Sequence, residues 1–246
     1  MVKWLAVLTH AGCDEMMMRQ VHAICALNVD HMFINLYSGE SVACDINTRC
    51  HYTMFHVIGM KPQLWKTVLS PDKVESFDFM WVMDSDIYPQ NVNLSRIAQH
   101  NVNVSQPSVV ISNVSRGSSH SQLNHRKSCK VARTQFVELM TPIFNVKAWI
   151  TFYNVILSNL DDLCSDWGLD YAWSVLNRDT TVFYDETVFH LNTKQMKKRN
   201  KSVCPQMKFS SNVVFIHDKF FNETPPFTRK FYGKVLCTQL FKHVEA

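Results

Sequence analysis

One apolar run that ends in two carboxylates constrains this chain more than any other stretch. Residues 77–83 read FDFMWVM, and Asp84-Ser85-Asp86 follows directly. Such a run is typical of a strand that is covered on both faces in a parallel or mixed sheet. The carboxyl end of that strand faces a ligand crevice, and two hard carboxylates there suit Mg2+ or Mn2+ holding a diphosphate. The alternative is an ordinary turn or helix cap, which is the commoner meaning of Asp-X-Asp at a strand end.

Strand and helix alternate at the start of the chain. Residues 3–9 form a compact apolar strand, Asp14 can cap a helix over residues 15–27, and residues 32–37 form a second strand. This order implies a right-handed crossover and an α/β sheet. Gly12 does not belong to a GxGxxG fingerprint, which disfavours a Rossmann-type dinucleotide fold. Further strands are predicted at 54–58, from 104, at 136–144, 181–190 and 212–216, and further helices at 63–69, 93–100, 146–160, 170–176 and 228–243.

The composition indicates one large core. A chain of 246 residues with 46% hydrophobic content can bury one core, or one domain with an appendage. We predict a domain over residues 1–202 and a C-terminal extension over residues 203–246 packed on it. The formal charge of +4 is modest, and the basic residues gather in 194–201 without interleaved aromatics, so nucleic-acid binding is not expected. No apolar stretch approaches the roughly 20 residues needed to span a bilayer.

The cysteines and the N-terminus lead to an expected location. Eight cysteines show no CxxC pair, which predicts reduced thiols, several of them buried. The first 15 residues lack the apolar segment and cleavage site of a signal peptide. We therefore expect a cytoplasmic protein. The Asn-X-Ser/Thr sequons at Asn93, Asn103, Asn113, Asn200 and Asn222 are expected to be incidental.

Four other polar residues are candidates for function. Lys61 precedes a helix and is either a diphosphate or ribose contact or a solvated lysine. Glu138 interrupts the apolar run FVELMTPIF, where a charge is rare unless it is paired or functional. Asp170 follows Gly168 in the first turn of a helix, where the dipole favours a carboxylate and where it could equally be a cap. His190 ends a strand, although a lone histidine is more often structural.

Five sequence blocks, taken in order, resemble a known family. They are SPDKVESFDFMWVMDSDI, VSQPSV, FVELMTPIFNVKAW, SDWGLDYAW and FYDETVFHLN, across roughly residues 70–192. They resemble the plant and bacterial family of uncharacterised proteins once described as lysine-ketoglutarate-reductase trans-splicing-related, which look like GT-A glycosyltransferases. The layout is also similar to small glycosyltransferase domains of large algal viruses, which act in the host cytoplasm. The resemblance implies a GT-A fold, with a mixed and mostly parallel central sheet flanked by helices.

The resemblance also implies roles for individual residues. Asp84 and Asp86 match the acidic pair of the metal site, in which the second carboxylate binds the ion directly and the first contacts ribose or water. His190 matches a metal-binding histidine, and Asp170 matches the catalytic base of inverting members. After the histidine the family continues with Gly-Leu-Pro, whereas this chain has LNTKQMKKRNK. The other implied contacts are Thr9, His10, Ala11, Lys61, Ser85, Lys194 and Lys198 for the nucleotide, and Glu138, Asp166 and Trp167 for the acceptor.

These features favour a metal-dependent, inverting glycosyltransferase that uses Mn2+ or Mg2+ and moves a sugar from a nucleotide-diphosphate donor, with a UDP-sugar favoured, to a glycan hydroxyl. A divalent ion and a lysine can stabilise the departing diphosphate, and a carboxylate can take the acceptor's proton. A phosphoryl or nucleotidyl transferase would also need two acidic metal ligands. A non-catalytic carbohydrate-binding domain could keep the same fold. The sequence does not indicate the sugar, the acceptor or the oligomeric state.

Overall fold

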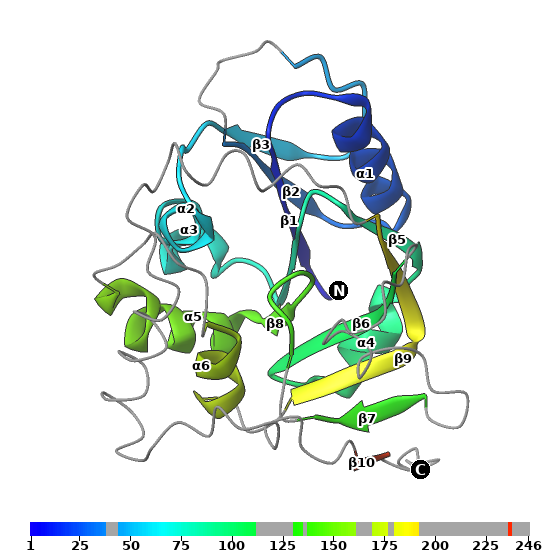
Figure 1. Cartoon of the computed structure of the whole chain (residues 1–246), viewed down its shortest axis with the longest axis vertical. Coiled ribbons are helices and arrows are strands. Elements are labelled where there is room, and N and C mark those ends of the chain that lie inside the picture. The colour runs from blue at the N-terminus through cyan, green and yellow to red at the C-terminus, as the bar shows by residue number, and fades with distance from the viewer. Residues whose placement is uncertain are drawn as a thin grey trace.

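One mixed β-sheet with helices on both faces forms the part of the chain that the computed structural model describes (Figure 1). That part comprises residues 1–37, 44–111, 130–134, 137–160, 169–176, 180–191 and 236–237. The strand order is β10-β7-β9-β6-β8-β4-β1-β2-β3, and β5 pairs with β9 off this path. The elements are β1 (Trp4–His10), α1 (Glu15–Ala26), β2 (His31–Leu36), β3 (Tyr52–Phe55), α2 (Lys61–Val68), α3 (Pro71–Val74), β4 (Phe79–Met83), β5 (Ile87–Asn91), α4 (Leu94–His100), β6 (Val104–Ile111), β7 (Val131–Arg133), β8 (Ile143–Asn145), α5 (Val146–Val155), the 3-10 turn η2 (Leu157–Asn159), α6 (Leu169–Leu176), β9 (Thr180–His190) and β10 (Leu236–Cys237).

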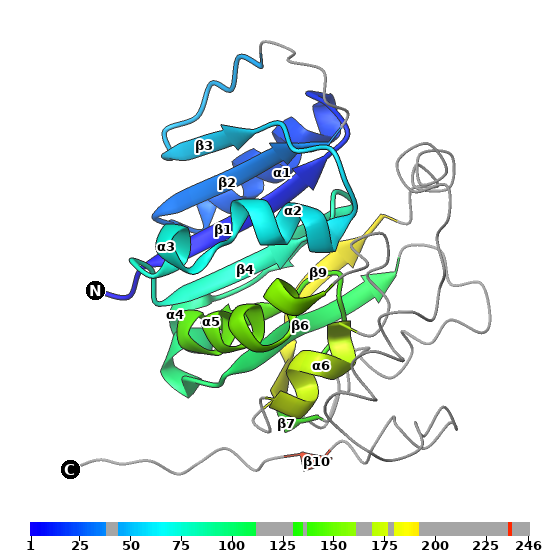
Figure 2. The same ribbon diagram turned by 90° about the vertical axis from the view of Figure 1, so that its left-hand side faces the viewer.

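The two faces of the sheet are covered by different helices (Figure 2). Because side chains alternate along a strand, β1 contributes to both cores. Trp4, Ala6 and Leu8 belong to the core under α1 and α4, while Leu5 and Val7 belong to the core under α2, α5 and α6. A strand buried on both faces is what the continuous apolar runs predict. None of the described helices has the length and apolar character needed to cross a bilayer.

The N-terminal half of the sheet is parallel. β3, β2, β1 and β4 pair side by side in the same direction, and every residue of β4 is buried. Beyond β4 the directions mix, because β8 runs antiparallel to both β4 and β6, while β6 and β9 run parallel. The mixed α/β sheet predicted from the sequence is confirmed. The carboxyl end of β4, where the acidic pair follows, therefore opens at the same edge as the ends of β1 and β2.

Two predicted elements are wrong. The strand expected over residues 136–144 is reduced to β8, because residues 139–141 turn and Pro142 has no N–H to donate to a ladder. The carbonyls of Met140 and Pro142 still accept hydrogen bonds from Asp84 and Val82. The helix expected over residues 228–243 is a strand at Leu236–Cys237, which pairs antiparallel with β7. The strand expected at 212–216 and the boundary near residue 203 lie outside the described residues.

Two disulfides join the segment before β3 to α1 and to the turn that precedes α1. Cys13 bonds Cys44, and Cys25 bonds Cys50. Their Cα atoms lie 5.8 and 5.7 Å apart, within the usual range for a disulfide. The prediction of reduced thiols is therefore wrong for these four cysteines. No short spacing could have revealed these bonds, because each joins residues that the fold brings together.

Candidate functional site at the end of strand β4

The acidic pair lies on a tight turn between β4 and β5. The Ile87 N–H donates to the Asp84 carbonyl at 3.1 Å, which closes the turn over Ser85 and Asp86. The neighbouring segments hold it from both sides. The Asp84 N–H donates to the Met140 carbonyl at 2.9 Å, and the Leu191 N–H donates to the Asp86 carbonyl at 2.9 Å. The turn is therefore a fixed platform that joins the end of β4 to the end of β9.

Asp84 forms an ion pair with Lys61. The Lys61 Nζ atom lies 2.6 Å from Asp84 Oδ1, and the two side chains are 13% and 20% exposed. Lys61 is the first residue of α2, after a loop from β3. Its ammonium also lies 3.4 Å from the Leu139 carbonyl. The structure thus brings Lys61 to the acidic turn, in place of the solvated position that the sequence left open.

Asp86 faces His190. The His190 Nε2 atom lies 3.1 Å from Asp86 Oδ2, and both side chains are about 15% exposed. This contact follows from pairing, because β5 runs antiparallel to β9 and Ile87 is opposite His190. Two residues that are far apart in the sequence, and that were both predicted as metal ligands, are therefore adjacent.

A carboxylate beside an imidazole fits a divalent ion such as Mn2+. Among the described residues, no group of three or more His, Cys, Asp or Glu side chains is arranged to hold an ion by itself. Phosphate oxygens and water would have to complete the coordination of an ion at Asp86 and His190, as is usual where an ion is held together with a substrate phosphate.

The predicted nucleotide contacts at the end of β1 lie beside the turn. The Thr9 hydroxyl donates to the Met83 carbonyl at 3.3 Å, and Ala11 is buried. His10 is 1% exposed, and its Nε2 atom lies 2.5 Å from Gln20 Oε1. Burial lowers the pKa of His10, although the Gln20 hydrogen bond, Asp14 and Asp86 act in the opposite direction. The His10 ring therefore faces the protein interior.

The predicted acceptor side is described in part. Glu138 is 6% exposed, and its backbone N–H donates to Gln106 Oε1. Asp170 lies in the first turn of α6, and α6 is anchored to the same segment because the Trp173 indole N–H donates to the Val137 carbonyl at 3.0 Å. The predicted contacts Asp166, Trp167, Lys194 and Lys198 lie outside the described residues.

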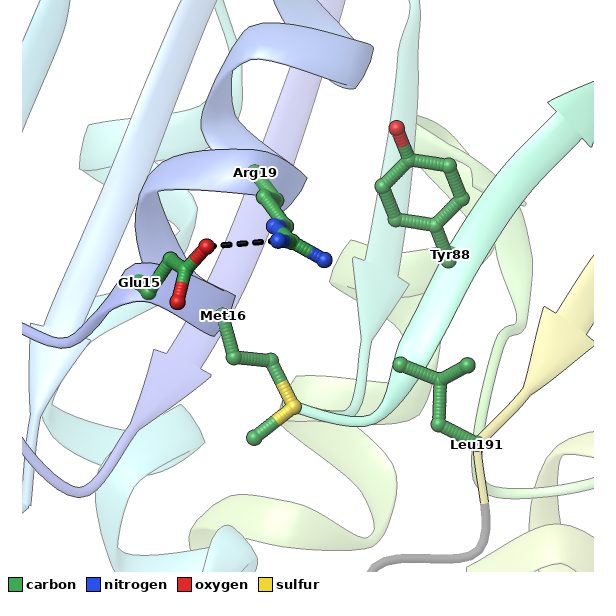
Figure 3. A pocket seen from close by; sticks show the side chains of 5 residues that line it. All are labelled: Glu15, Met16, Arg19, Tyr88 and Leu191. Atoms are coloured by element: carbon green, nitrogen blue, oxygen red, sulfur yellow. Dashed lines mark hydrogen bonds and ion pairs between the residues drawn. The ribbon is translucent and has the colours of Figure 1, made fainter.

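A pocket of about 400 Å3 adjoins the turn on the α1 side (Figure 3). It lies close to the acidic pair because Tyr88 is on β5, two residues after Asp86, and Leu191 directly follows His190. Arg19 and Glu15 form an exposed ion pair at its rim. No sequence pattern indicates this pocket, because its residues come from three distant segments. It is lined by Glu15, Met16, Arg19, Tyr88 and Leu191.

The fold is shared with a nucleotide-sugar transferase of known structure. The crystal structure of GalNAc-T7 with UDP, GalNAc and Mn2+ superimposes with a TM-score of 0.62 at 10% identity, over 90% of this chain and 48% of that one. The chain has a GT-A-like fold, as predicted, and spans about half of the GalNAc-T7 structure. It belongs to the family described as "Protein of unknown function (DUF707)", which matches residues 50–234.

A197 from STIV matches with a TM-score of 0.45 at 9% identity, over 78% of this chain and 87% of A197. No curated protein matches the sequence.

Proposed function

We propose that this protein is a metal-dependent glycosyltransferase that moves a sugar from a nucleotide-diphosphate donor, with a UDP-sugar favoured, to a hydroxyl of a glycan. The observation that carries the proposal is the arrangement at the end of β4, where Asp86 faces His190 and Asp84 faces Lys61. This arrangement supports the proposal, because Asp86 and His190 can offer an oxygen and a nitrogen ligand to a cation and Lys61 brings a positive charge to the same turn. A GT-A-like fold supports the same reading, because the similar GalNAc-T7 structure holds UDP and Mn2+.

The charged residues at and around the turn have separate parts in binding the donor. Asp86 and His190 would hold Mn2+ or Mg2+, and the ion would stabilise the negative charge that develops on the departing diphosphate. Lys61 contributes a fixed positive charge beside the same group, while Asp84 keeps the Lys61 ammonium in place. Lys194 and Lys198, in the basic segment after β9, are proposed as further diphosphate contacts.

Asp170 is proposed as the base in a single displacement. The bond between the anomeric carbon and the phosphate oxygen breaks, and its electron pair leaves with the nucleoside diphosphate. The acceptor oxygen bonds to the anomeric carbon from the opposite side, and its proton passes to the Asp170 carboxylate. This direct displacement inverts the anomeric configuration. Glu138, Asp166 and Trp167 are proposed to contact the acceptor.

The pocket beside the turn is proposed to hold a sugar ring of the substrate. Tyr88 offers an aromatic face for the apolar face of a sugar, and the Arg19–Glu15 pair can form charge-assisted hydrogen bonds with its hydroxyl groups. We expect Tyr88→Ala to raise the KM for the sugar substrate several-fold with little change in the affinity for UDP. Tyr88→Phe, which keeps the ring, is the matched control. An unchanged KM in Tyr88→Ala would mean that this pocket does not bind the sugar.

The test of the proposal is the release of UDP from a panel of UDP-sugars with and without Mn2+. Release that needs the ion and is lost in Asp86→Ala supports a transferase, and the exposed carboxylate variant Asp72→Ala is the control for a nonspecific loss. Ion-dependent binding of UDP without turnover on any sugar would favour a carbohydrate-binding domain. Transfer of phosphate or nucleotide to the acceptor would favour the phosphoryl or nucleotidyl transferase.

A further inference from the structure

Gln20 is a buried amide on the apolar face of α1. It is 1% exposed, and its helix neighbours Met17, Val21 and Ile24 belong to the core that packs on the sheet. Removing an amide from water costs free energy unless its donors and acceptor find partners. A glutamine at this position therefore needs a specific reason to be there.

The partners of Gln20 are the two ends of the acidic turn. Its Nε2 atom donates to the Asp84 carbonyl at 2.9 Å and to the Ile87 carbonyl at 2.5 Å. A glutamine amide has two N–H donors, and both are used here. The Asp84 carbonyl also accepts from the Ile87 N–H, so one amide group holds the first and the last residue of the turn that contains Asp86.

His10 holds the other side of the same amide. The Gln20 Oε1 atom can only accept hydrogen bonds, so the His10 ring donates from Nε2. Burial lowers the pKa of His10, which favours the neutral ring, and the contact with the acceptor Gln20 Oε1 requires the proton of that ring on Nε2. A series of hydrogen bonds thus links His10 at the end of β1, through Gln20 on α1, to the turn at the end of β4.

We propose that Gln20 is a positioning residue for the proposed donor site: its side-chain amide fixes the backbone of the Asp84–Ile87 turn so that Asp86 faces His190 and Asp84 faces Lys61. The inference rests on the proposed function only for the identity of the ligand. Gln20 is buried beneath the turn and is not itself proposed as a ligand. Removing a hydrogen-bond partner of a metal ligand usually changes metal affinity by about 10–100-fold. Gln20 holds the backbone of the turn and not the Asp86 carboxylate, and we expect its effect to fall within this range.

Few side chains could take its place. A methionine matches the length of glutamine but has no N–H group, and an asparagine is one methylene shorter. A glutamate would direct carboxylate oxygens at two carbonyl oxygens. The turn therefore requires a long, neutral side chain with two donors, which only glutamine supplies at this distance.

The experiment compares Gln20→Met with Trp149→Phe. Trp149 is fully buried, and its indole N–H donates to the Leu69 carbonyl at 2.8 Å, so Trp149→Phe removes a buried hydrogen bond to a carbonyl away from the turn and from the segments that hold it. Two quantities are measured on the full chain: the affinity for Mn2+·UDP by calorimetry, and the hydrogen exchange of the Ile87 amide relative to the global stability. Should Gln20→Met fail to fold, Gln20→Asn retains a polar amide in the core and is tested in the same way.

We expect Gln20→Met to weaken Mn2+·UDP binding by about 10–100-fold and to accelerate exchange at Ile87. In Trp149→Phe, binding should be unchanged and exchange at Ile87 should follow the global stability. Equal affinity and equal protection in the two variants would overturn the positioning role. A wild-type chain that binds no Mn2+·UDP would refute the proposed function, while the exchange of Ile87 would still decide whether Gln20 fixes the turn.

Discussion

Asp84 and Asp86 are separated by one residue on the same turn, yet their side chains meet different partners. Asp84 lies 2.6 Å from the Lys61 ammonium, and Asp86 lies 3.1 Å from the His190 imidazole. An ammonium group has donors but no acceptor, so it can neutralise Asp84 but cannot join it in binding a cation. A neutral imidazole can be a metal ligand. We therefore propose that the turn has a ligand side, Asp86 with His190, and a charge-neutralised side, Asp84 with Lys61.

The largest expected effect tests this division directly. Asp86→Ala should weaken Mn2+·UDP binding by more than about 100-fold, beyond the range typical of an outer partner, because it removes a ligand. Asp84→Asn should cost about 10-fold, because it disturbs only the partner of Lys61. Calorimetry with Mn2+ and UDP measures both.

His190→Ala is the companion to Asp86→Ala and should give a similar loss. Thermal unfolding of all three variants should stay close to wild type, because Asp84 and Asp86 sit in a turn after β4 and His190 ends β9. Equal losses in Asp84→Asn and Asp86→Ala would mean that both carboxylates hold the ion, and the division would be wrong.

The next effect concerns the proposed base, which belongs to neither side of the turn. Asp170→Asn should keep the affinity for Mn2+·UDP but lower turnover by about 100-fold or more, the usual scale for general-base catalysis. If Asp170 only capped the helix, Asp170→Asn would keep its turnover, because asparagine caps a helix about as well as aspartate. Initial rates of UDP release with acceptor measure the loss.

Asp166 is the rival base, and Asp166→Asn should be tested in the same assay. The anomeric configuration of the product, read by NMR, separates the mechanisms. Full activity in Asp170→Asn, or a product that retains the donor's configuration, would contradict the assignment of an inverting base.

The sequence predicted the ligand side better than the rest of the site. The apolar run before Asp84 and the strand that ends at His190 each predict their strand ends, because a buried strand leaves a pattern in consecutive residues. The meeting of Asp86 and His190 depends on the pairing of β5 with β9, which no sequence pattern indicated. The family resemblance implied only that both residues are metal ligands.

Sequence patterns indicated the roles of Lys61 and Gln20 less clearly. Lys61 before a helix looks the same whether it is solvated or paired. Gln20 reads as a polar position on an amphipathic helix, although its place three residues after Met17 puts it on the apolar face. The bonds Cys13–Cys44 and Cys25–Cys50 depend on the fold and not on spacing. Such bonds persist mainly in oxidising environments, so the cysteines give no support to the cytoplasmic location, which stays a prediction.

A smaller effect is expected from Lys61. Lys61→Met removes the ammonium, so Mn2+·UDP binding should weaken by about 10-fold, the equivalent of about 1.4 kcal/mol. The affinity for Mn2+ alone should be unchanged or higher, because the Asp84 carboxylate loses its cation. Lys66→Met, on the outer part of the same helix, is the control and should match wild type. A loss of Mn2+ affinity in Lys61→Met would place Lys61 on the ligand side and would contradict the comparison.

The smallest expected effect concerns His10, the hydrogen-bond partner of Gln20. It is a change in how the stability of the fold depends on pH. Burial lowers the pKa of His10 in the folded state, so below pH 6.5 the unfolded chain takes up a proton that the folded ring does not. Stability should therefore fall as the pH drops from 6.5 towards the folded pKa. His10→Gln can still donate to Gln20 but does not titrate, so its melting temperature should fall less than that of wild type between pH 7.5 and 5.5. His31→Gln is the control, because the pKa of His31 is also lowered but the residue is only partly buried, and it should flatten the profile less. A slope in His10→Gln equal to that of wild type would mean that His10 takes up its proton over the same pH range in the folded and unfolded chain, and the lowered pKa of the buried ring would have to be abandoned.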